Sequence, residues 1–433
     1  MNNIMFLARL LVLFSLVCIS CAHSSFEQKQ LKHALDFATS NRLELEILLQ
    51  HYTYDSLKLE AAKFLIRNMP HCYSYQQGGE MDSVKRVRTY YSPFGQIDQT
   101  YARRWGHYTY RNLPKIYDAH IITAEYLIDN IDRAFDNWQK RPWNRSLSFE
   151  DFCEYLLPYR IGDEPLEEWR ELYEKKYGYL LDSIYKGSDV VEAANLVSKH
   201  LQEPVFIYCE DFELPHIGPR YLFSHRYGSC VDAADIVTYA FRAVGIPCME
   251  DTDARGGHVW NVVRDTTGRD VPIWYIASEA VRGSRDTGGY KRGKVYRPMY
   301  GFQEEKAAHL GDDWKSMPLL FYHPYMKDVS YAYYPDTLRI LTGIPDDEVC
   351  YLAHFHEAHW WSCACARSAS GKMEIPNLES ELVYLPMKYT KGNYYPSGFP
   401  FWFAGGEINT FLPDWEKTVK VRLYRKYPVY GWL

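Results

Sequence analysis

One helix-like segment followed by two strand-like runs constrains the fold more than any other part of the sequence. Residues 231–244 have apolar side chains at helical spacing, without proline or glycine. Gly245-Ile246-Pro247 ends this pattern, because a C′ glycine followed by proline stops a helix. Two strand-like runs, residues 257–264 and 271–277, follow across a turn that contains Gly268. The order predicts an α+β unit in the middle of the chain.

The flanking segments have different patterns. Upstream, apolar residues recur at helical spacing, and Asp55 and Ser148 stand where helices would begin. Downstream, strand-like runs dominate, the clearest over residues 381–386 and the last over residues 419–424. The 433 residues exceed what one ordinary core holds. We therefore predict an α+β protein with a mostly helical region over residues 27–200, a central α+β domain over residues 201–325 and a β-rich, sandwich-like domain over residues 330–433.

The composition excludes two classes of protein. Apolar residues make up 47% and charged residues 24% of the chain, which is the balance of a folded protein, so disorder is not its main state. Lys and Arg total 49 against 55 Asp and Glu. Because neutralising phosphates requires a basic surface, we expect no nucleic-acid partner.

The first twenty residues have the pattern of an export signal. Arg9 precedes an apolar run over residues 10–17, which is too short to span a bilayer. Cys18-Ile19-Ser20-Cys21 is similar to a bacterial lipobox, with Cys18 where leucine is usual. We expect residues 1–20 to be removed and Cys21 to receive a lipid that anchors the chain to the outer membrane or cell surface. Secretion without lipid, for instance into the periplasm, and a retained anchor are the alternatives.

Cys230 has the position of a reactive thiol, whereas the other cysteines show no regular spacing. It stands where a loop becomes a helix, so unpaired backbone N–H groups and the positive end of the helix dipole would lower its pKa. Gly228 permits the close backbone approach that this entry needs. His258, 28 residues further on, could take the thiol proton and return it to a leaving amine. A buried structural thiol and a core histidine are the alternatives.

Three motifs in this order resemble the transglutaminase-like superfamily of papain-type cysteine enzymes: Gly228-Ser229-Cys230, the helix end Arg242–Pro247, and Gly256-Gly257-His258-Val259-Trp260. The resemblance covers roughly residues 205–280, and more loosely the chain looks like exported transglutaminase-like lipoproteins of Gram-negative bacteria. It implies a papain-like central domain with Cys230 as the nucleophile and His258 as the base. It implies no metal and no organic cofactor.

The third catalytic position departs from the family pattern. The family usually has an Asp on the strand after the histidine strand. The predicted hairpin pairs His258 with about residue 277, and Asp265 and Asp270 lie at its turn, about 20 Å away along a strand. Glu279 is the nearest carboxylate. The orienting acid is therefore Glu279, or displaced, or missing.

A second group of residues has the composition of a metal site. His356-Glu357-Ala358-His359 is one residue short of the spacing that puts two ligands on one helix face. On a strand, His354 and His356 would share a face and could bind zinc with Cys363 or Cys365. We favour strands with incidental histidines and cysteines, and predict no metal.

The tail is also rich in aromatic residues, which serve either as sugar-stacking platforms or in cores. We favour packing for most of them; the candidates for stacking are Tyr384, Tyr389, Tyr394, Tyr395 and Trp402.

The resemblance implies thiol chemistry on the amide bonds of protein or peptide substrates. An acyl-enzyme would form on Cys230 and be resolved by water or by an amine. We expect hydrolysis rather than transfer, since water is abundant outside the cell. The competing function is a catalytically decayed surface module that binds peptide or glycopeptide. A third is an amidase that releases glycans from asparagine.

Overall fold

The computed structural model describes residues 26–417, except 80, 84, 87–109, 209–213, 256, 277, 285–290, 311–316, 319, 321–322, 342–343 and 357–358, and it also describes residue 420. The predicted signal peptide, the lipidation site Cys21 and nearly all of the predicted last strand, residues 419–424, lie outside the described residues. Within them, no helix is long and apolar enough to cross a membrane. The protein is of the α+β class, with helices mostly before and strands mostly after residue 245.

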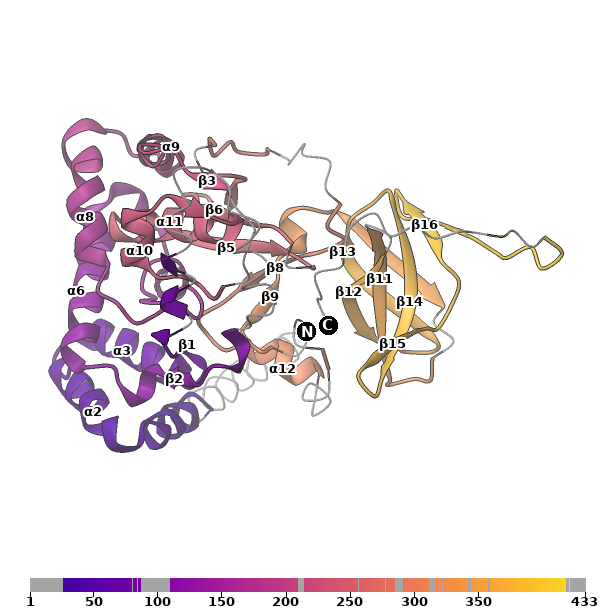
Figure 1. Cartoon of the computed structure of the whole chain (residues 1–433), viewed down its shortest axis with the longest axis horizontal. Coiled ribbons are helices and arrows are strands. Elements are labelled where there is room, and N and C mark those ends of the chain that lie inside the picture. Colours follow the sequence, from indigo (N-terminus) through magenta and orange to yellow (C-terminus); the bar gives the residue numbers. More distant parts are fainter. Residues whose placement is uncertain are drawn as a thin grey trace, which may run out of the picture. The chain divides into compact units, whose positions relative to one another are not determined.

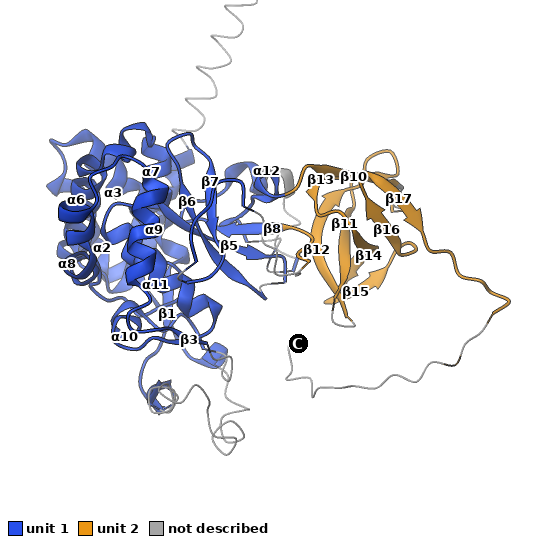
Figure 2. Cartoon of the chain, turned by 90° about the horizontal axis from the view of Figure 1, so that it is seen from above, with its two compact units in different colours: residues 1–290, 295–333 blue, residues 291–294, 334–433 orange. Residues whose placement is uncertain are grey.

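The chain folds into two compact units (Figure 2). Unit 1 contains residues 1–290 and 295–333, and unit 2 contains residues 291–294 and 334–433. The predicted limits of three domains stay a prediction. Among its described residues, unit 1 has two large hydrophobic cores and a smaller buried cluster of Tyr75, Met81 and Tyr110.

Helices form most of the first half of unit 1 (Figure 1). After a helical segment over residues 26–37, they are α2 (Arg42–His51), α3 (Ser56–Asn68), α6 (Ala124–Lys140), α7 (Phe149–Tyr155), α8 (Arg170–Tyr179), α9 (Val190–His200), α10 (Pro219–Ser224), α11 (Cys230–Ala243) and, much later, α12 (Glu304–Leu310). The Asp55 and Ser148 side chains cap α3 and α7 by accepting hydrogen bonds from backbone N–H groups three residues on, as predicted.

A five-stranded antiparallel sheet in the order β7-β6-β5-β8-β9 forms the centre of unit 1. Its strands are β5 (Cys248–Asp253), β6 (Val259–Arg264), β7 (Asp270–Ile273), β8 (Val295–Pro298) and β9 (Met326–Asp328). Two short pairs lie beside it: β1 (Tyr73–Tyr75) with β2 (Lys115–Tyr117), and β3 (Ile207–Tyr208) with β4 (Tyr227–Gly228). β7 is shorter than the predicted run 271–277, because a turn closed by the bond from Ser278 N to Tyr275 O follows it.

Helix α11 packs against β5 and β6 (Figures 1 and 2). The hydrophobic core around α11 contains residues of α8, α9, α11 and the sheet. Among them are Tyr173, Val197, Ile236, Phe241 and Val263. Gly245 follows the helix with a φ of +81°, a conformation that favours glycine, which confirms the predicted helix end.

Unit 2 is built from strands only, within the part of it that the structure describes. A six-stranded antiparallel sheet has the order β12-β11-β14-β16-β17, and β15 pairs with β14; β10 and β13 form a separate pair. The strands are β10 (Asp336–Leu341), β11 (Val349–His356), β12 (His359–Arg367), β13 (Lys372–Leu378), β14 (Leu382–Thr390), β15 (Asn393–Pro396), β16 (Phe401–Ala404) and β17 (Glu407–Thr410).

Candidate active site

Cys230 is the first residue of α11 and is partly buried. The preceding Ser229 is the N-cap and forms a capping box with Asp232, whose carboxylate accepts the Ser229 N–H over 2.7 Å. The parallel pairing of Tyr208 with Gly228 leads the chain into this helix start. The thiol therefore lies at a helix N-terminus, where the dipole favours a negative charge.

The side of α11 that contains Cys230 faces β6. Residues 230, 234 and 238 are spaced by one helical turn each and so lie on one side of the helix. The Asn261 side chain, on β6, donates to the Ala234 carbonyl over 3.0 Å and to Thr238 Oγ1 over 2.9 Å. Cys230 lies one turn before Ala234 on the same side.

Helix α11 and strand β6 run in the same direction. At the far end of the helix, Arg242 Nε donates to the carbonyl of Cys248, which pairs with Val263 near the end of β6. Nearer the start of the helix, the Ala234 carbonyl accepts from Asn261, which lies two residues before Val263 on β6. Cys230 begins α11, and His258 directly precedes β6. Because the helix and the strand run in the same direction, the two residues lie toward the same end of this helix–strand pair.

His258 directly precedes β6, and both its backbone carbonyl and its imidazole ring contact neighbouring residues. Its carbonyl accepts hydrogen bonds from Asp253 N over 3.2 Å and from Thr252 Oγ1 over 3.1 Å. Its ring stacks on Trp260, with centroids 5.7 Å apart, and lies against Tyr275 at 5.3 Å. These contacts limit the orientations of the imidazole.

Asp253, which was not predicted as a site residue, stabilises the turn that precedes His258. Its buried carboxylate accepts the backbone N–H groups of Arg255 and Gly257, each over 2.9 Å, and Arg255 Nη2 over 3.0 Å. An Asp that precedes a glycine-containing turn between two strands is the signal that could have revealed it. Asp253 is a positioning residue for the loop.

Two tyrosines, Tyr208 and Tyr275, lie near Cys230 and His258 respectively. Neither was predicted as a site residue. Burial raises the pKa of the Tyr208 phenol, a hydrogen bond with the Ile276 backbone opposes this, and nearby Cys230 and Tyr275 raise it further. Tyr208 is therefore within electrostatic reach of the thiol, and Tyr275 lies against the His258 ring. Both side chains remain 40–50% exposed, at 46% and 42%.

The β6–β7 ladder does not extend to His258. The pairing ends at Asn261 with Ile273, and a turn follows β7, so the predicted partner position of His258, about residue 277, lies outside the described residues. Ile276 packs against the core. Glu279 is exposed and takes part in no hydrogen bond or ion pair among the described residues. Its role as the orienting acid stays a prediction.

The two aspartates at the turn have other partners. Asp265 accepts the backbone N–H groups of Thr267 and Arg269, which closes the turn. Asp270 pairs with Arg297 over 2.7 Å. Both lie at the far end of β6 from His258, as the sequence predicts.

A cavity of about 210 Å³ adjoins the start of α11. Ser229 and Val231, the two neighbours of Cys230, line it together with His216 and Asp163. His216 pairs with the fully buried Asp235 over 2.9 Å. Burial disfavours the imidazolium, but the attraction of Asp235 outweighs it and raises the pKa of His216. His216 is not predictable from the sequence, because no motif surrounds it.

The other described cysteines of unit 1, Cys72, Cys153 and Cys248, are buried, and the second histidine group belongs to unit 2. No disulfide joins any two of the seven cysteines that the structure describes. The rings of His354 and His356 lie 6.4 Å apart on β11. Across the described residues, no group of three or more His, Cys, Asp or Glu side chains is arranged to hold a metal ion.

Comparison of the chain with models of known protein families, with curated proteins and with solved structures finds no match. The candidate site is therefore defined by its own geometry.

Proposed function

We propose that the protein is a thiol-dependent hydrolase of amide bonds with Cys230 as its nucleophile. The proposal is supported most directly by the packing of α11 along β6 in the same direction, since Cys230 begins the helix and His258 directly precedes the strand. A nucleophile beside a base that is itself held in place is the arrangement that covalent acyl transfer requires.

In the proposed reaction His258 takes the thiol proton as the Cys230 sulfur attacks the carbonyl carbon of the amide. The negative charge that forms on the carbonyl oxygen is stabilised by N–H donors, to which the Cys230 backbone N–H at the helix start is suited. His258 then protonates the leaving amine, and an acyl-enzyme remains. Water, deprotonated by His258, attacks the acyl group and releases the acid and the thiol.

The substrate class and the location are part of the proposal. We expect protein, peptide or glycopeptide substrates outside the cell, with the chain attached to the outer membrane or cell surface through a lipid on Cys21. We also assign the centre of unit 1 to the transglutaminase-like, papain-type fold and unit 2 to a β-sandwich-like fold. Hydrolysis is favoured over transfer because water is the abundant acceptor there.

The test is the rate of iodoacetamide labelling of each cysteine, mapped by mass spectrometry between pH 5 and 9. A Cys230 thiolate paired with imidazolium would label selectively well below pH 8, and His258→Ala would remove that selectivity. Cys365, which is also partly buried but belongs to unit 2, is the internal control. Labelling of Cys230 no faster than Cys365, or unchanged in His258→Ala, would refute the proposal.

The second candidate function is a surface module that binds peptide or glycopeptide without turnover. The observation that favours it is that Glu279, the nearest candidate for the orienting acid, is exposed and takes part in no hydrogen bond or ion pair among the described residues. A loss of the acid weakens but does not abolish a Cys–His pair, because the acid chiefly orients the imidazole. Glycopeptides should be included in the substrate screen, since an amidase that releases glycans from asparagine would use the same residues. Binding of such ligands by an inert Cys230 would support the module.

A further inference from the structure

The large sheet of unit 2 has a buried face and a face that contains exposed aromatic residues. On the buried face, the register aligns His354, Tyr384 and Phe401 across three strands, and each is at most 3% exposed. Tyr384 therefore cannot serve as the sugar platform considered from the sequence. Because side chains alternate along a strand, the neighbouring residues belong to the other face.

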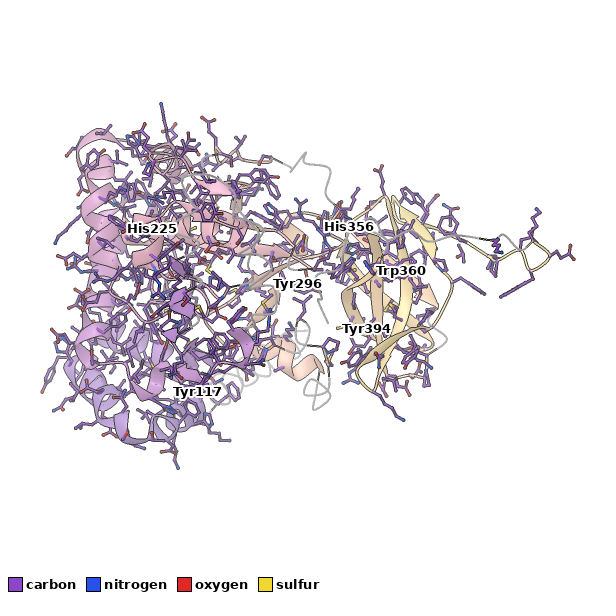
Figure 3. The ribbon with its side chains drawn as sticks, in the orientation of Figure 1. Tyr117, His225, Tyr296, His356, Trp360 and Tyr394 are labelled. Carbon is purple, nitrogen blue, oxygen red and sulfur yellow. The ribbon has the colours of Figure 1, made fainter. Side chains whose placement is uncertain are left out.

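That other face contains a row of five residues, three of them aromatic, that crosses five strands. The register pairs Phe355 with Trp360, Val383 with Trp402, and Trp402 with Asn409. His354 pairs with Tyr384, so the next position of this register puts Phe355 beside Val383. This connects the Phe355–Trp360 pair with the Val383–Trp402 pair. We call Trp360, Phe355, Val383, Trp402 and Asn409 the outer row; Figure 3 labels Trp360 among these strands.

The aromatic rings of the outer row are accessible and suitably spaced. Phe355 is 48% and Trp402 36% exposed, and the Trp360 ring lies 5.1 Å from that of Phe355. Phe355 and Trp402 are two strands apart, which is roughly 10 Å. Phe411, 50% exposed, extends the surface beside Trp402, because its N–H bonds to the Pro400 carbonyl and continues the pairing of β16 with β17.

The polar side chains at one end of the outer row are an amide and a carboxylate. Asn409 ends the outer row, and Glu407, two residues earlier on β17, lies on the same face; both are exposed. No lysine or arginine belongs to the outer row. The face thus offers flat apolar rings together with a carboxylate and an amide.

We propose that the outer row is a binding site for a neutral oligosaccharide chain. The C–H faces of sugar rings are flat and apolar and match exposed aromatic rings, while their hydroxyls donate to carboxylate and amide oxygens. The carboxylate and the absence of cations in the row disfavour anionic ligands. An extended peptide recognises the edge of a sheet, where backbone groups are available, whereas the outer row crosses the face of paired strands. This site does not depend on catalysis by Cys230.

The test is affinity electrophoresis of the full chain through gels that contain a neutral β-glucan, mannan or galactan, followed by calorimetric titration with oligosaccharides of whichever retards it. Trp402→Ala and Phe355→Ala should each weaken binding roughly tenfold, since each removes one stacking ring. Tyr395→Ala removes an equally exposed ring, 47% accessible, outside the row and should bind as the unaltered chain does. Circular dichroism would verify that all three variants are folded.

Four outcomes would overturn the proposal. They are retardation by none of the neutral polysaccharides, retardation only by an anionic one such as pectin, equal losses in Tyr395→Ala and Trp402→Ala, and competition by peptides for the same site. Cys230→Ala should bind glycan normally, so failure of the catalytic proposal and failure of this one are separable.

Discussion

The side-chain amide of Asn261 on β6 donates to the carbonyl of Ala234 on α11 over 3.0 Å. The same nitrogen lies 2.9 Å from Thr238 Oγ1, and the Asn261 side chain is almost fully buried. Asn261 thus links the helix that begins with Cys230 to the strand that follows His258.

Asn261→Ala should therefore affect both stability and thiol reactivity. It leaves the buried Thr238 hydroxyl without this donor and should lower the free energy of unfolding by about 1–3 kcal/mol, measured by urea denaturation. Selective labelling of Cys230 should decrease with it, because the helix is no longer held in register. Asn393→Ala, which removes an exposed bond to Lys391 O, is the matched control and should change neither. Equal effects of the two variants would contradict the assignment.

The buried thiols should be unreactive toward iodoacetamide at neutral pH. Burial raises the pKa of Cys72 and of Cys248 to about 12 and that of Cys350 to about 11, from an ordinary value of 9.0. At pH 7.5 these thiols are protonated and should not react with iodoacetamide in the folded chain. Rapid labelling of any of the three under these conditions would contradict this.

The same shifts predict an alkaline loss of stability. A folded-state pKa above the unfolded value means that the unfolded chain releases its protons first as the pH rises. The contribution of these thiols to stability is complete below about pH 9 and falls from there toward pH 11–12. Cys350→Ala should reduce the slope of unfolding free energy against pH in this range, measured by urea denaturation at successive pH values.

Asp253 and Glu279 should differ in their effect on the reactivity of Cys230. Asp253→Asn would weaken three hydrogen bonds that hold the turn before His258, so we expect labelling of Cys230 below pH 8 to slow severalfold. Glu279→Gln alters an exposed side chain without a bonded partner among the described residues and should have little effect. The reverse order of effects would identify Glu279 as the orienting acid.

Gly245→Ala should destabilise unit 1. The residue has a φ of +81°, and a Cβ there would lie 2.8 Å from the Asn137 carbonyl oxygen, so both backbone strain and a clash arise. We expect a loss of at least about 1–2 kcal/mol in unfolding free energy. Gly268→Ala, with a φ of +77° but nothing within 4 Å, isolates the strain alone and should cost less. An equal loss in both would show that the contact with Asn137 has no energetic effect.

Local patterns in the sequence were sufficient for the elements that depend on neighbouring residues. The start and end of α11, the hairpin after it and the caps Asp55 and Ser148 follow from capping chemistry, glycine conformation and periodicity, all of which act over a few residues.

Only the tertiary structure decided what faces the candidate pair. The parallel alignment of α11 with β6, the His216–Asp235 pair, Tyr208 beside Cys230 and the outer row of unit 2 all join residues from different elements. Such contacts depend on packing and strand register, which a periodic pattern does not specify. The sequence by itself determined that Cys230 begins a helix and that His258 precedes a strand. That the helix start and the strand start lie toward the same end of the α11–β6 pair was decided by the tertiary structure. Side chains such as Asn261 form hydrogen bonds between these two segments, which are separate along the chain.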